Sequence, residues 1–593
     1  MTKECSRQFA WRTENVSFSC AGRSVPPAYS RIRQDIYNCD KKRRTKAKGR
    51  QALRAQNLYR TAAYVTAFSV AEKAFGFLYR IILSRTLGSE GMGIYQIALS
   101  VFAVLITAAS SGIPLTVSRL ITKYRAKNNK KAQQSVVTAA LVCALLFSVP
   151  VFCVLFFAHG AFDFLFSDPR CMAVLLVLLP SLTFNSVYAV IRGALWGNKQ
   201  FIPYCIIDLA EELVMIGAGI VLVTAMTDVF DGAKRAALAV VLSYLVSFTM
   251  AGIWYFAKGG RLKDPRRQLK PLLASALPIT GMRTSNSLVN SAISLLLPAR
   301  LIAAGFTSSE AMSEIGVATG MSMPVLSIPA TLIGSLALVL VPELAENFYR
   351  GQHEKMRENI ERAIKVTVLV ACLLIPTLFV LGEDIGILLF SNAHGGRIIR
   401  NSCLMLLPMS LSMISTGILN SLGCEKQSCS FFFAGAAATL LCVWFLPQVA
   451  GVYALLIGMT ASYLLTMLLN LRLILKKCRE KPHFLKHALC TAATLPPVIL
   501  FGVLLRRMLG SLLPDLAAIG ACFVLLAAVQ ALFLYALGLI KPRGGPVFRR
   551  TNQPPPRRRA PPLTKTNARP PCRERRARSL TVRYFSPRRK ETL

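Results

Sequence analysis

The sequence predicts an all-α integral membrane protein with about fourteen membrane-spanning helices. Three observations predict this class. Apolar segments of about 20 residues recur along the chain, Lys and Arg concentrate in alternate loops, and part of the sequence repeats about 228 residues further on. The composition agrees, because 53% of the 593 residues are hydrophobic.

The apolar segments have the length that a membrane requires. A hydrocarbon core about 30 Å thick is crossed by about 20 residues of α-helix. Segments of that length follow one another along the chain, separated by short charged loops. The predicted spans lie near residues 60–84, 93–118, 134–158, 171–193, 203–226, 236–257, 271–297, 315–341, 363–382, 400–421, 429–447, 452–474, 486–505 and 514–540.

The loops carry an uneven charge. Lys and Arg concentrate after the even-numbered spans, as in TKYRAKNNKK (122–131) and KGGRLKDPRRQLK (258–270). Cytoplasmic loops are the ones that carry such an excess. The asymmetry therefore predicts an even number of spans in a cytoplasmic membrane, with both termini in the cytoplasm.

The chain also repeats itself. LLPSLTFNSVYAVIRGALWGNKQ (178–200) resembles LLPMSLSMISTGILNSLGCEKQ (406–427), six spans later. Because six is even, the two halves have parallel topology, and two such bundles enclose a central cleft, as transporters commonly do. The predicted parts are two pseudo-symmetric six-helix bundles (59–257 and 271–475), the linker between them (258–270) and two additional helices (476–540).

Two basic tails flank the apolar body. Residues 1–58 and 541–593 together hold about 25 of the formal net charge of +42. They contain Pro-rich Arg runs such as PPPRRRAPP and no periodic apolar face, so we expect disordered cytoplasmic tails near anionic lipid. Since no basic face with interleaved aromatic residues is present, the charge does not indicate a nucleic-acid partner.

The sequence carries no motif of catalysis or metal binding. The sixteen cysteines are scattered through apolar segments without a CxxC pair, and the five histidines lack ligand spacing. We find no P-loop, no HExxH and no GxSxG. We therefore expect no cofactor, no metal and no enzymatic activity, and an ATP-driven pump is disfavoured.

The stretch AEKAFGFLYRIILSRTLGSEGMGIYQ (71–96) places three charges inside the first predicted span. A charge at the bilayer centre costs about 2.5–3.5 kcal/mol on insertion scales, so it usually faces a cavity or a partner. Lys73 and Arg80 are seven residues apart and share one helix face, which Glu72 borders. We expect both cations to line a cavity. The alternative is that Glu72 pairs with one of them only to help helices pack.

The first span of the second half also carries a cation. Arg283, Asn286 and Asn290 align at spacings of three and seven residues. Pseudo-symmetry would set this stripe across one cleft from the cations of the first span. The sequence thus predicts a cavity lined by the cations and amides of both spans.

The fifth span carries the acidic residues Asp208, Glu211 and Glu212. Acidic residues near a helix start complement the helix dipole, which is one interpretation. The other is that Asp208, together with Glu72, is a coupling site or a charge partner inside the membrane.

Four segments carry a resemblance to a known family: GFLYRIILSRTLGSEGMGIYQ (76–96), SSGIPLTVSRLITKY (110–124), IRGALWGNKQFIPYCIIDLAEELV (191–214) and GMSMPVLSIPATLIGSLALVLVPELAE (320–346). They resemble the stage V sporulation protein B family, in the polysaccharide-transporter branch of the multidrug/oligosaccharidyl-lipid/polysaccharide (MOP) exporter superfamily. The resemblance covers about residues 60–540 and implies two six-helix bundles plus two further helices.

The resemblance implies a function in transport. It implies a flippase for an undecaprenyl-pyrophosphate-linked sugar, either a cell-wall (peptidoglycan or spore cortex) precursor or another lipid-linked oligosaccharide. We expect the protein to be a monomer. In related lipid II flippases, cationic residues of the first and seventh helices line the central cavity. Arg80 and Arg283 match that pattern, whereas the basic tails depart from the family.

Two other functions stay open on the sequence alone. A cation-coupled multidrug antiporter of the same superfamily would favour acidic residues in its cavity, so Glu72 and Asp208 support it and the buried cations oppose it. A non-transporting membrane scaffold would not need charges inside the membrane in both halves.

Overall fold

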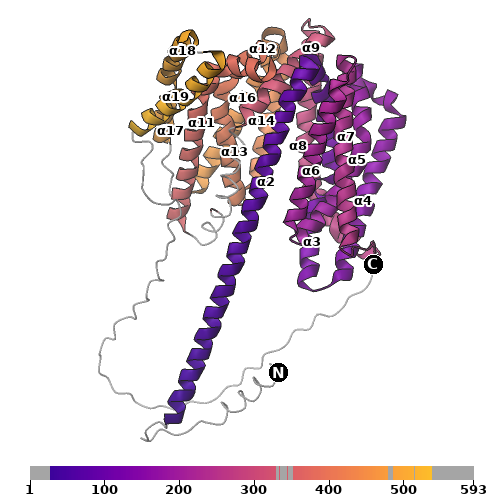
Figure 1. Ribbon diagram of the computed structural model, residues 1–593, viewed down its shortest axis with the longest axis vertical. Coiled ribbons are helices and arrows are strands. Elements are labelled where there is room, and N and C mark those ends of the chain that lie inside the picture. Colours follow the sequence, from indigo (N-terminus) through magenta and orange to yellow (C-terminus); the bar gives the residue numbers. More distant parts are fainter. Residues whose placement is uncertain are drawn as a thin grey trace, which may run out of the picture. The chain divides into compact units, whose positions relative to one another are not determined.

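The computed structural model describes residues 27–328, 333, 344, 352–478, 485–512 and 514–536. Every regular element in these ranges is a helix (Figure 1). The first half comprises α2 (Pro27–Ser110), α3 (Ile113–Ala126), α4 (Lys130–Phe157), the 3₁₀ helix η1 (His159–Leu165), α5 (Pro169–Gly197), α6 (Phe201–Thr224) and α7 (Val229–Ala257).

The second half follows after a linker at residues 258–265. It comprises α8 (Arg266–Ala303), α9 (Ser308–Ile315), the π-helix η2 (Gly316–Ser322), α11 (His353–Phe390), α12 (Ala393–Ser402), the 3₁₀ helix η3 (Cys403–Met405), α13 (Leu406–Ser421), α14 (Glu425–Phe445), α15 (Pro447–Ala450) and α16 (Tyr453–Lys477). Three further helices complete the described chain: α17 (Leu485–Ala492), α18 (Leu495–Leu512) and α19 (Asp515–Ala536).

The protein is a multi-pass membrane protein. Within the described ranges, 11 helical segments are long and apolar enough to cross a bilayer, and the first of them, Phe68–Ala126, covers two predicted spans. α6 is not among the 11, although it has the length of a span, because it carries Asp208, Glu211 and Glu212. The predicted span at 315–341 lies largely outside the described residues. The predicted number of fourteen is therefore not confirmed.

α2 begins within a segment for which the composition predicts disorder. The helix starts at Pro27, so residues 27–58 of the predicted tail are helical (indigo in Figure 1). Ala, Leu, Arg, Lys and Gln are frequent in this segment, and all five have high helix propensity. The low hydrophobicity of residues 27–58 argues against a helix with a buried apolar face, but it does not argue against a helix. The predicted tail at 541–593 lies outside the described residues.

A sharp bend at Gly88 divides α2 into the first and second spans. Gly88 has φ 71° and ψ −175°, a conformation that glycine adopts without the steric penalty of a Cβ. We call the end of the helices that carries this bend the Gly88 end. The opposite end, which carries the linker at 258–265, is the linker end.

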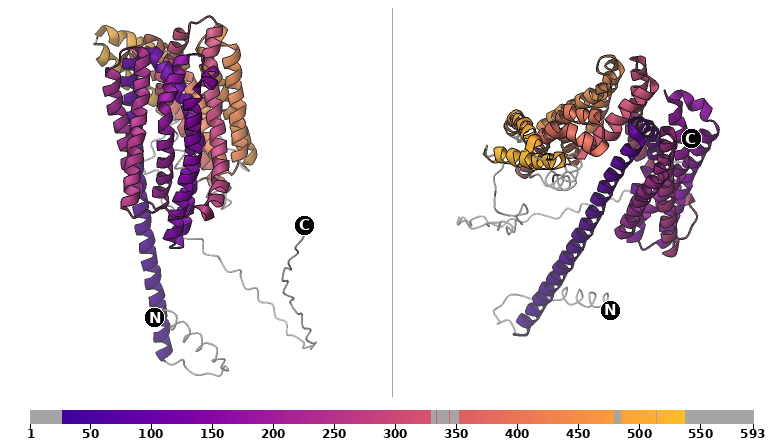
Figure 2. Two further views of the ribbon diagram at one scale, coloured as in Figure 1. Left: turned by 90° about the vertical axis from the view of Figure 1, so that its right-hand side faces the viewer. Right: turned by 45° about the horizontal axis from the view of Figure 1, so that its top comes forward.

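The helices of the two halves pack in corresponding pairs. In the first half α5 and α6 both pack on α7, and in the second half α13 and α14 both pack on α16. The left view of Figure 2 shows the helices of the first half (purple to magenta) side by side. α18 and α19 pack on α11. Arg506 of α18 forms a bidentate ion pair with Asp384 of α11, at 2.8 and 3.0 Å.

The halves touch most closely at a crossing of backbones near the Gly88 end. A Cβ on Gly93 of α2 would lie 1.8 Å from the carbonyl oxygen of Met312, and a Cβ on Gly316 would lie 1.9 Å from that of Ser89. No side chain fits at such distances, so glycine is required at both positions. Met92 and Met312, which lie at this crossing, are both fully buried.

Replacing Gly93 by alanine is expected to destabilise the folded protein by roughly 1–3 kcal/mol, as overpacking of a tight core does. The measurement is the thermal unfolding midpoint of the purified protein in detergent. Gly217→Ala on α6 is the matched control, because nothing lies within 4 Å of a Cβ there. Equal midpoints for both variants would contradict the close backbone crossing.

Candidate functional site

α2, which contains the first two spans, packs on α8, the first span of the second half. Arg283 of α8 donates a hydrogen bond to the carbonyl oxygen of Ser111, at 3.0 Å. Ser111 and Gly112 form the break between α2 and α3, and a Cβ on Gly112 would lie 2.3 Å from the Thr280 hydroxyl. Arg283 is exposed, and this is its one hydrogen bond in the part of the chain that the structure describes. Most of its guanidinium is therefore free to bind an anion.

Arg80 lies on the first span, eight residues before the Gly88 bend. It is half-buried. Arg80 has no hydrogen bond or ion pair among the described residues. It is therefore a guanidinium inside a membrane span without a carboxylate partner, which is an expensive arrangement that usually marks a functional site.

The two arginines lie at different depths, which the sequence did not predict. Arg80 is eight residues from Gly88, whereas Ser111, the partner of Arg283, is 23 residues from it on the other arm of the bend. At 1.5 Å per helical residue the two cations are roughly 20 Å apart along α2. Arg80 and Arg283 therefore lie at different heights along α2. That both line one cleft, as the repeat suggests, stays a prediction.

The amides of α8 lie on the Gly88 side of Arg283. Asn290 is exposed and Asn286 is half-buried. The Asn286 side-chain oxygen is shielded from solvent and has no hydrogen-bond partner within the described ranges. A buried polar atom of this kind is available to a ligand.

Lys73 and Glu72 form an ion pair with each other. Their closest charged atoms are 3.3 Å apart, and their side chains are 75% and 30% exposed, respectively. An exposed pair of this kind contributes little to stability. Lys73 therefore remains available at the surface of α2, on the linker side of Arg80.

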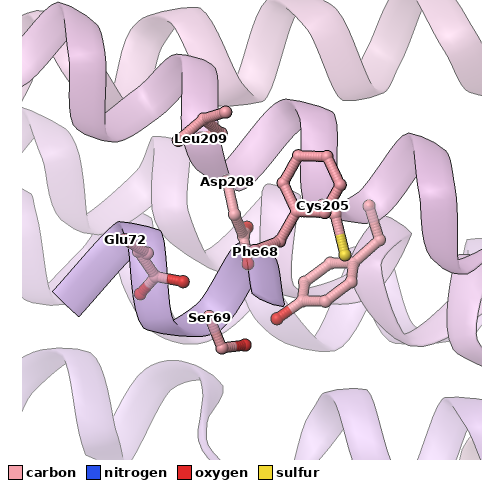
Figure 3. A pocket seen from close by; sticks show the side chains of 7 residues that line it. Phe68, Ser69, Glu72, Cys205, Asp208 and Leu209 are labelled. Atoms are coloured by element: carbon pink, nitrogen blue, oxygen red, sulfur yellow. The ribbon is translucent and has the colours of Figure 1, made fainter. Parts of the chain in front are cut away.

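Glu72 and Asp208 line one small pocket between α2 and α6 (Figure 3). The pocket has about 10 Å³ of free space, close to what one water molecule needs. The other lining residues are Phe68, Ser69, Tyr204, Cys205 and Leu209. The structure thus brings together two acidic residues that are 136 positions apart in the sequence.

The acidic residues of α6 do not serve the helix dipole. α6 begins at Phe201 and has no acidic residue in its first turn. Asp208 accepts a hydrogen bond from the Tyr188 hydroxyl of α5. The Glu212 carboxylate lies against Gly76, whose added Cβ would be 2.8 Å from Oε1. The dipole interpretation is therefore wrong, because a dipole acts within the first turn and these carboxylates lie further along, facing other helices.

Arg192 of α5 is a further charged residue of this region that the sequence analysis missed. Its guanidinium lies over the rings of Tyr188 and Trp196, at 5.4 and 5.7 Å from their centroids. Its Nε is buried and has no hydrogen-bond partner among the described residues. The available signal was an arginine at the end of an apolar span, flanked by aromatic residues at helical spacing.

The chain is similar to known families and proteins. The family described as polysaccharide biosynthesis protein matches residues 58–348, and the putative exopolysaccharide exporter family matches residues 282–506. Stage V sporulation protein B of Bacillus subtilis (strain 168) is 24% identical over 365 residues, which cover 58% of this chain and 69% of that protein. The lipid II flippase MurJ of the same organism is 20% identical over 356 residues, which cover 54% and 63%, respectively.

Solved structures show the same fold. A structure of the lipid II flippase MurJ, in an inward closed conformation, aligns with a TM-score of 0.61 and 13% identity over 80% of this chain and 99% of its own. An inward-facing multidrug resistance MATE family transporter aligns with a TM-score of 0.57 and 17% identity over 67% and 92%, respectively. In sequence, the chain therefore resembles stage V sporulation protein B and the polysaccharide-transporter branch of the MOP superfamily, and it has the fold of the transporters of that superfamily.

Proposed function

We propose that the protein is a flippase that moves a lipid-linked oligosaccharide or cell-wall precursor across the cytoplasmic membrane by alternating access. The observation that carries the proposal is the pair of arginines, Arg80 and Arg283, placed within membrane spans without a carboxylate partner among the described residues. The matching families and the similarity to stage V sporulation protein B and MurJ support it.

The proposed cargo fits the chemistry of these residues. An undecaprenyl-pyrophosphate-linked sugar has an anionic pyrophosphate, neutral sugars and a long lipid tail. A guanidinium offers a planar fork of donors that matches phosphate oxygens, and Asn286 and Asn290 can hydrogen-bond sugar hydroxyls. The lipid tail stays in the bilayer while the head group crosses between the halves. The cargo leaves chemically unchanged, so the protein acts as a transporter and not as an enzyme.

The two depths suggest an order of contacts. In the proposed orientation the linker end faces the cytoplasm, because the basic loops at 122–131 and 258–270 lie there. The head group then meets Arg283 and Lys73 first and reaches Arg80, nearer to the Gly88 end, later. Two separated sites of moderate strength let an anion enter and leave without being trapped.

Glu72 and Asp208 form the proposed coupling site. Their shared pocket has room for one water, and the Tyr188 hydroxyl bonds to Asp208. Binding of a proton or a monovalent cation there would change the charge between α2 and α6 and so bias the relative position of these helices.

A cation-coupled multidrug antiporter is the second candidate, and the same acidic pocket favours it. A direct test separates the two functions. Purified protein in proteoliposomes is given either a fluorescent undecaprenyl-pyrophosphate-linked sugar or a flat cationic dye. Movement of the lipid-linked sugar without movement of the dye supports the flippase, and movement of the dye alone overturns it.

The proposed orientation makes a separate prediction. Single cysteines replace Ser391, at the Gly88 end, and Lys263, in the linker, in a protein whose native cysteines have been removed. A membrane-impermeant maleimide added to intact cells should label the cysteine at position 391, and the one at 263 only after permeabilisation, because the basic linker faces the cytoplasm. Labelling of both positions in intact cells would exclude this orientation.

A further inference from the structure

Apart from those of α8, the contacts of the second half with the first half are concentrated at one end of the molecule. Among the described residues, the parts of the second half beyond α8 that pack on the first half are α9, η2 and α11. Their hydrogen bonds and tight contacts involve the bend of α2 and the residue before α5: Ser313 with Ser89, Leu389 with Arg85, Met312 with Gly93, and Ser308 with Asp168. All of these lie at the Gly88 end.

The linker end is joined differently. There the first half bonds to α8 and to the linker, through Tyr124 to Gln268 at 3.0 Å and through Ser135 to the Asp264 carbonyl at 2.5 Å. No hydrogen bond reaches from the first half to α12–α19 within the described residues. A rocking motion that separates the halves at the Gly88 end must therefore break the contacts of α9.

α9 is a short helix held in a fixed position. Thr307 and Glu310 form a capping box at its start, in which each side chain bonds to the backbone of the other residue. At its far end Glu314 contacts His394 of α12, with 2.9 Å between Oε2 and Nε2. The helix is thus anchored in the second half, and it presents Ser308 and Ser313 to the first.

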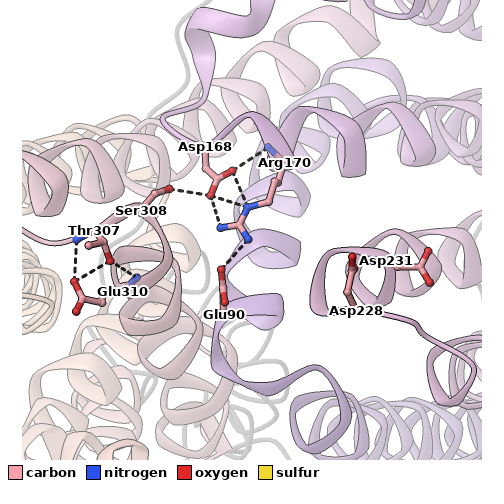
Figure 4. A network of polar contacts seen from close by, with 8 residues as sticks. All are labelled: Glu90, Asp168, Arg170, Asp228, Asp231, Thr307, Ser308 and Glu310. Carbon is pink, nitrogen blue, oxygen red and sulfur yellow. Dashed lines mark hydrogen bonds and ion pairs between the residues drawn. The ribbon is translucent and has the colours of Figure 1, made fainter.

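Asp168 is the residue of the first half that bonds to Ser308 of α9 (Figure 4). Ser308 donates a hydrogen bond to Asp168 Oδ2 at 2.9 Å. The Asp168 side chain is 2% exposed and is held by the Arg170 guanidinium, 2.8 Å away, which also contacts Glu90 of α2 at 2.7 Å. Asp168 also caps α5 by accepting a bond from the Arg170 backbone nitrogen. Residues of the first half thus hold the Asp168 carboxylate in position without help from α9.

The charge of Asp168 persists at neutral pH. Burial raises the pKa of Asp168, but the hydrogen bonds from Arg170 and Ser308 lower it by more, so the pKa lies below its usual value. When the Ser308 contact opens, Arg170 and Glu90 stay with Asp168 in the first half. No buried charge is left unpaired, and the contact can break and re-form repeatedly.

We infer that α9 is a clamp that closes the Gly88 end of the transport path, with Ser308 and Ser313 as its contacts and Asp168, positioned by Arg170 and Glu90, as its receptor. The inference rests on the proposed transport function for its meaning, but the closure itself can be measured without cargo. Weakening the clamp shifts the population toward the state that is open at the Gly88 end.

The first test measures closure directly. Spin labels are attached through noncanonical amino acids at Asp163 of η1 and Val449 of α15, two exposed positions at the Gly88 end in different halves, and their distance distribution is recorded for the full chain in lipid nanodiscs. Ser308→Ala removes a hydrogen bond to a charged group, so the ratio of long to short distances should rise by about tenfold. Asp168→Asn should act in the same direction.

Asp228→Asn is the matched control. Asp228 also caps a helix of the first half at this end, through a 2.6 Å bond from the Asp231 nitrogen, and neither residue bonds to α9 in the described part of the chain (Figure 4). Its distance distribution should equal that of the unmodified protein. If Ser308→Ala and Asp168→Asn also leave the distribution unchanged, or if Asp228→Asn shifts it equally, α9 is not a clamp.

The second test locks the clamp. The hydroxyl oxygens of Ser89 and Ser313 are 2.7 Å apart, so Ser89→Cys with Ser313→Cys should form a disulfide on oxidation. The oxidised protein should show the short distance alone, and reduction should restore the mixture. Loss of transport on oxidation and its return on reduction support the clamp in the cycle. Unchanged distances in the oxidised protein contradict it, whereas a normal clamp in a protein that moves no lipid-linked sugar contradicts only the proposed function.

Discussion

Replacing both Arg80 and Arg283 by alanine is expected to lower the rate of lipid-linked sugar flipping by at least about tenfold. Each substitution removes a charge-assisted hydrogen bond worth roughly 1.5–3 kcal/mol, and neither Arg80 nor Arg283 has a carboxylate partner among the described residues. The measurement is the initial flipping rate in proteoliposomes of matched protein content.

The single variants separate two roles. Arg283 also bonds to the Ser111 carbonyl, so Arg283→Ala removes a link between α8 and the α2–α3 break as well as an anion site. Lysine at either position should restore part of the rate, because it keeps the charge but lacks the planar fork. If an arginine is purely structural, its alanine variant should have a lower unfolding midpoint, and its flipping rate should not depend on the charge of the head group.

Arg507→Ala is the matched control for both positions. Arg507 is also an arginine within an apolar helix, but it lies exposed on α18, away from α2 and α8. Its variant should flip at the unmodified rate. Unimpaired flipping by a well-folded Arg80→Ala, Arg283→Ala protein would end the proposal that these cations bind the pyrophosphate.

Neutralising the acidic pocket is the second change with a large expected effect. Glu72→Gln combined with Asp208→Asn is expected to remove the response of flipping to an imposed pH or sodium gradient and to lower the driven rate by about tenfold or more. Both carboxylates line the same pocket. The double variant therefore leaves neither of these two carboxylates to bind the coupling ion. A coupling ion that no longer binds cannot bias the conformational equilibrium.

The single variants and one control sharpen this test. If Glu72 acts only as the partner of Lys73, 3.3 Å away, Glu72→Gln should change the rate little, because an exposed ion pair is worth at most about 1 kcal/mol. Tyr188→Phe removes the hydrogen bond to Asp208 and should give an intermediate rate. Glu425→Gln, at an exposed position of α14, should leave both rate and gradient response unchanged. A full gradient response in the Glu72, Asp208 double variant would contradict the coupling site.

The sequence by itself predicted the class of the protein and most of its helices. Apolar segments of membrane length show where helices lie because an uncompensated backbone cannot enter hydrocarbon, and the predicted segment at 134–158 corresponds to α4 (Lys130–Phe157). The charges inside the spans were also visible, since their cost makes each one conspicuous. The low hydrophobicity of residues 27–58 predicted disorder, whereas their high helix propensity agrees with the start of α2 at Pro27.

What the tertiary structure decided is which of these charges meet, and at what depth. Spacing along a helix shows that Lys73 and Arg80 share a face, but not that Asp208 of another helix shares a pocket with Glu72. The repeat predicted one cleft for Arg80 and Arg283 but not their heights, which the Gly88 bend and the bond to Ser111 set apart. The clamp of α9 on Asp168 joins residues 140 positions apart. Sequence periodicity describes one helix at a time, while contacts between helices depend on their rotation, tilt and relative height, which are set by packing.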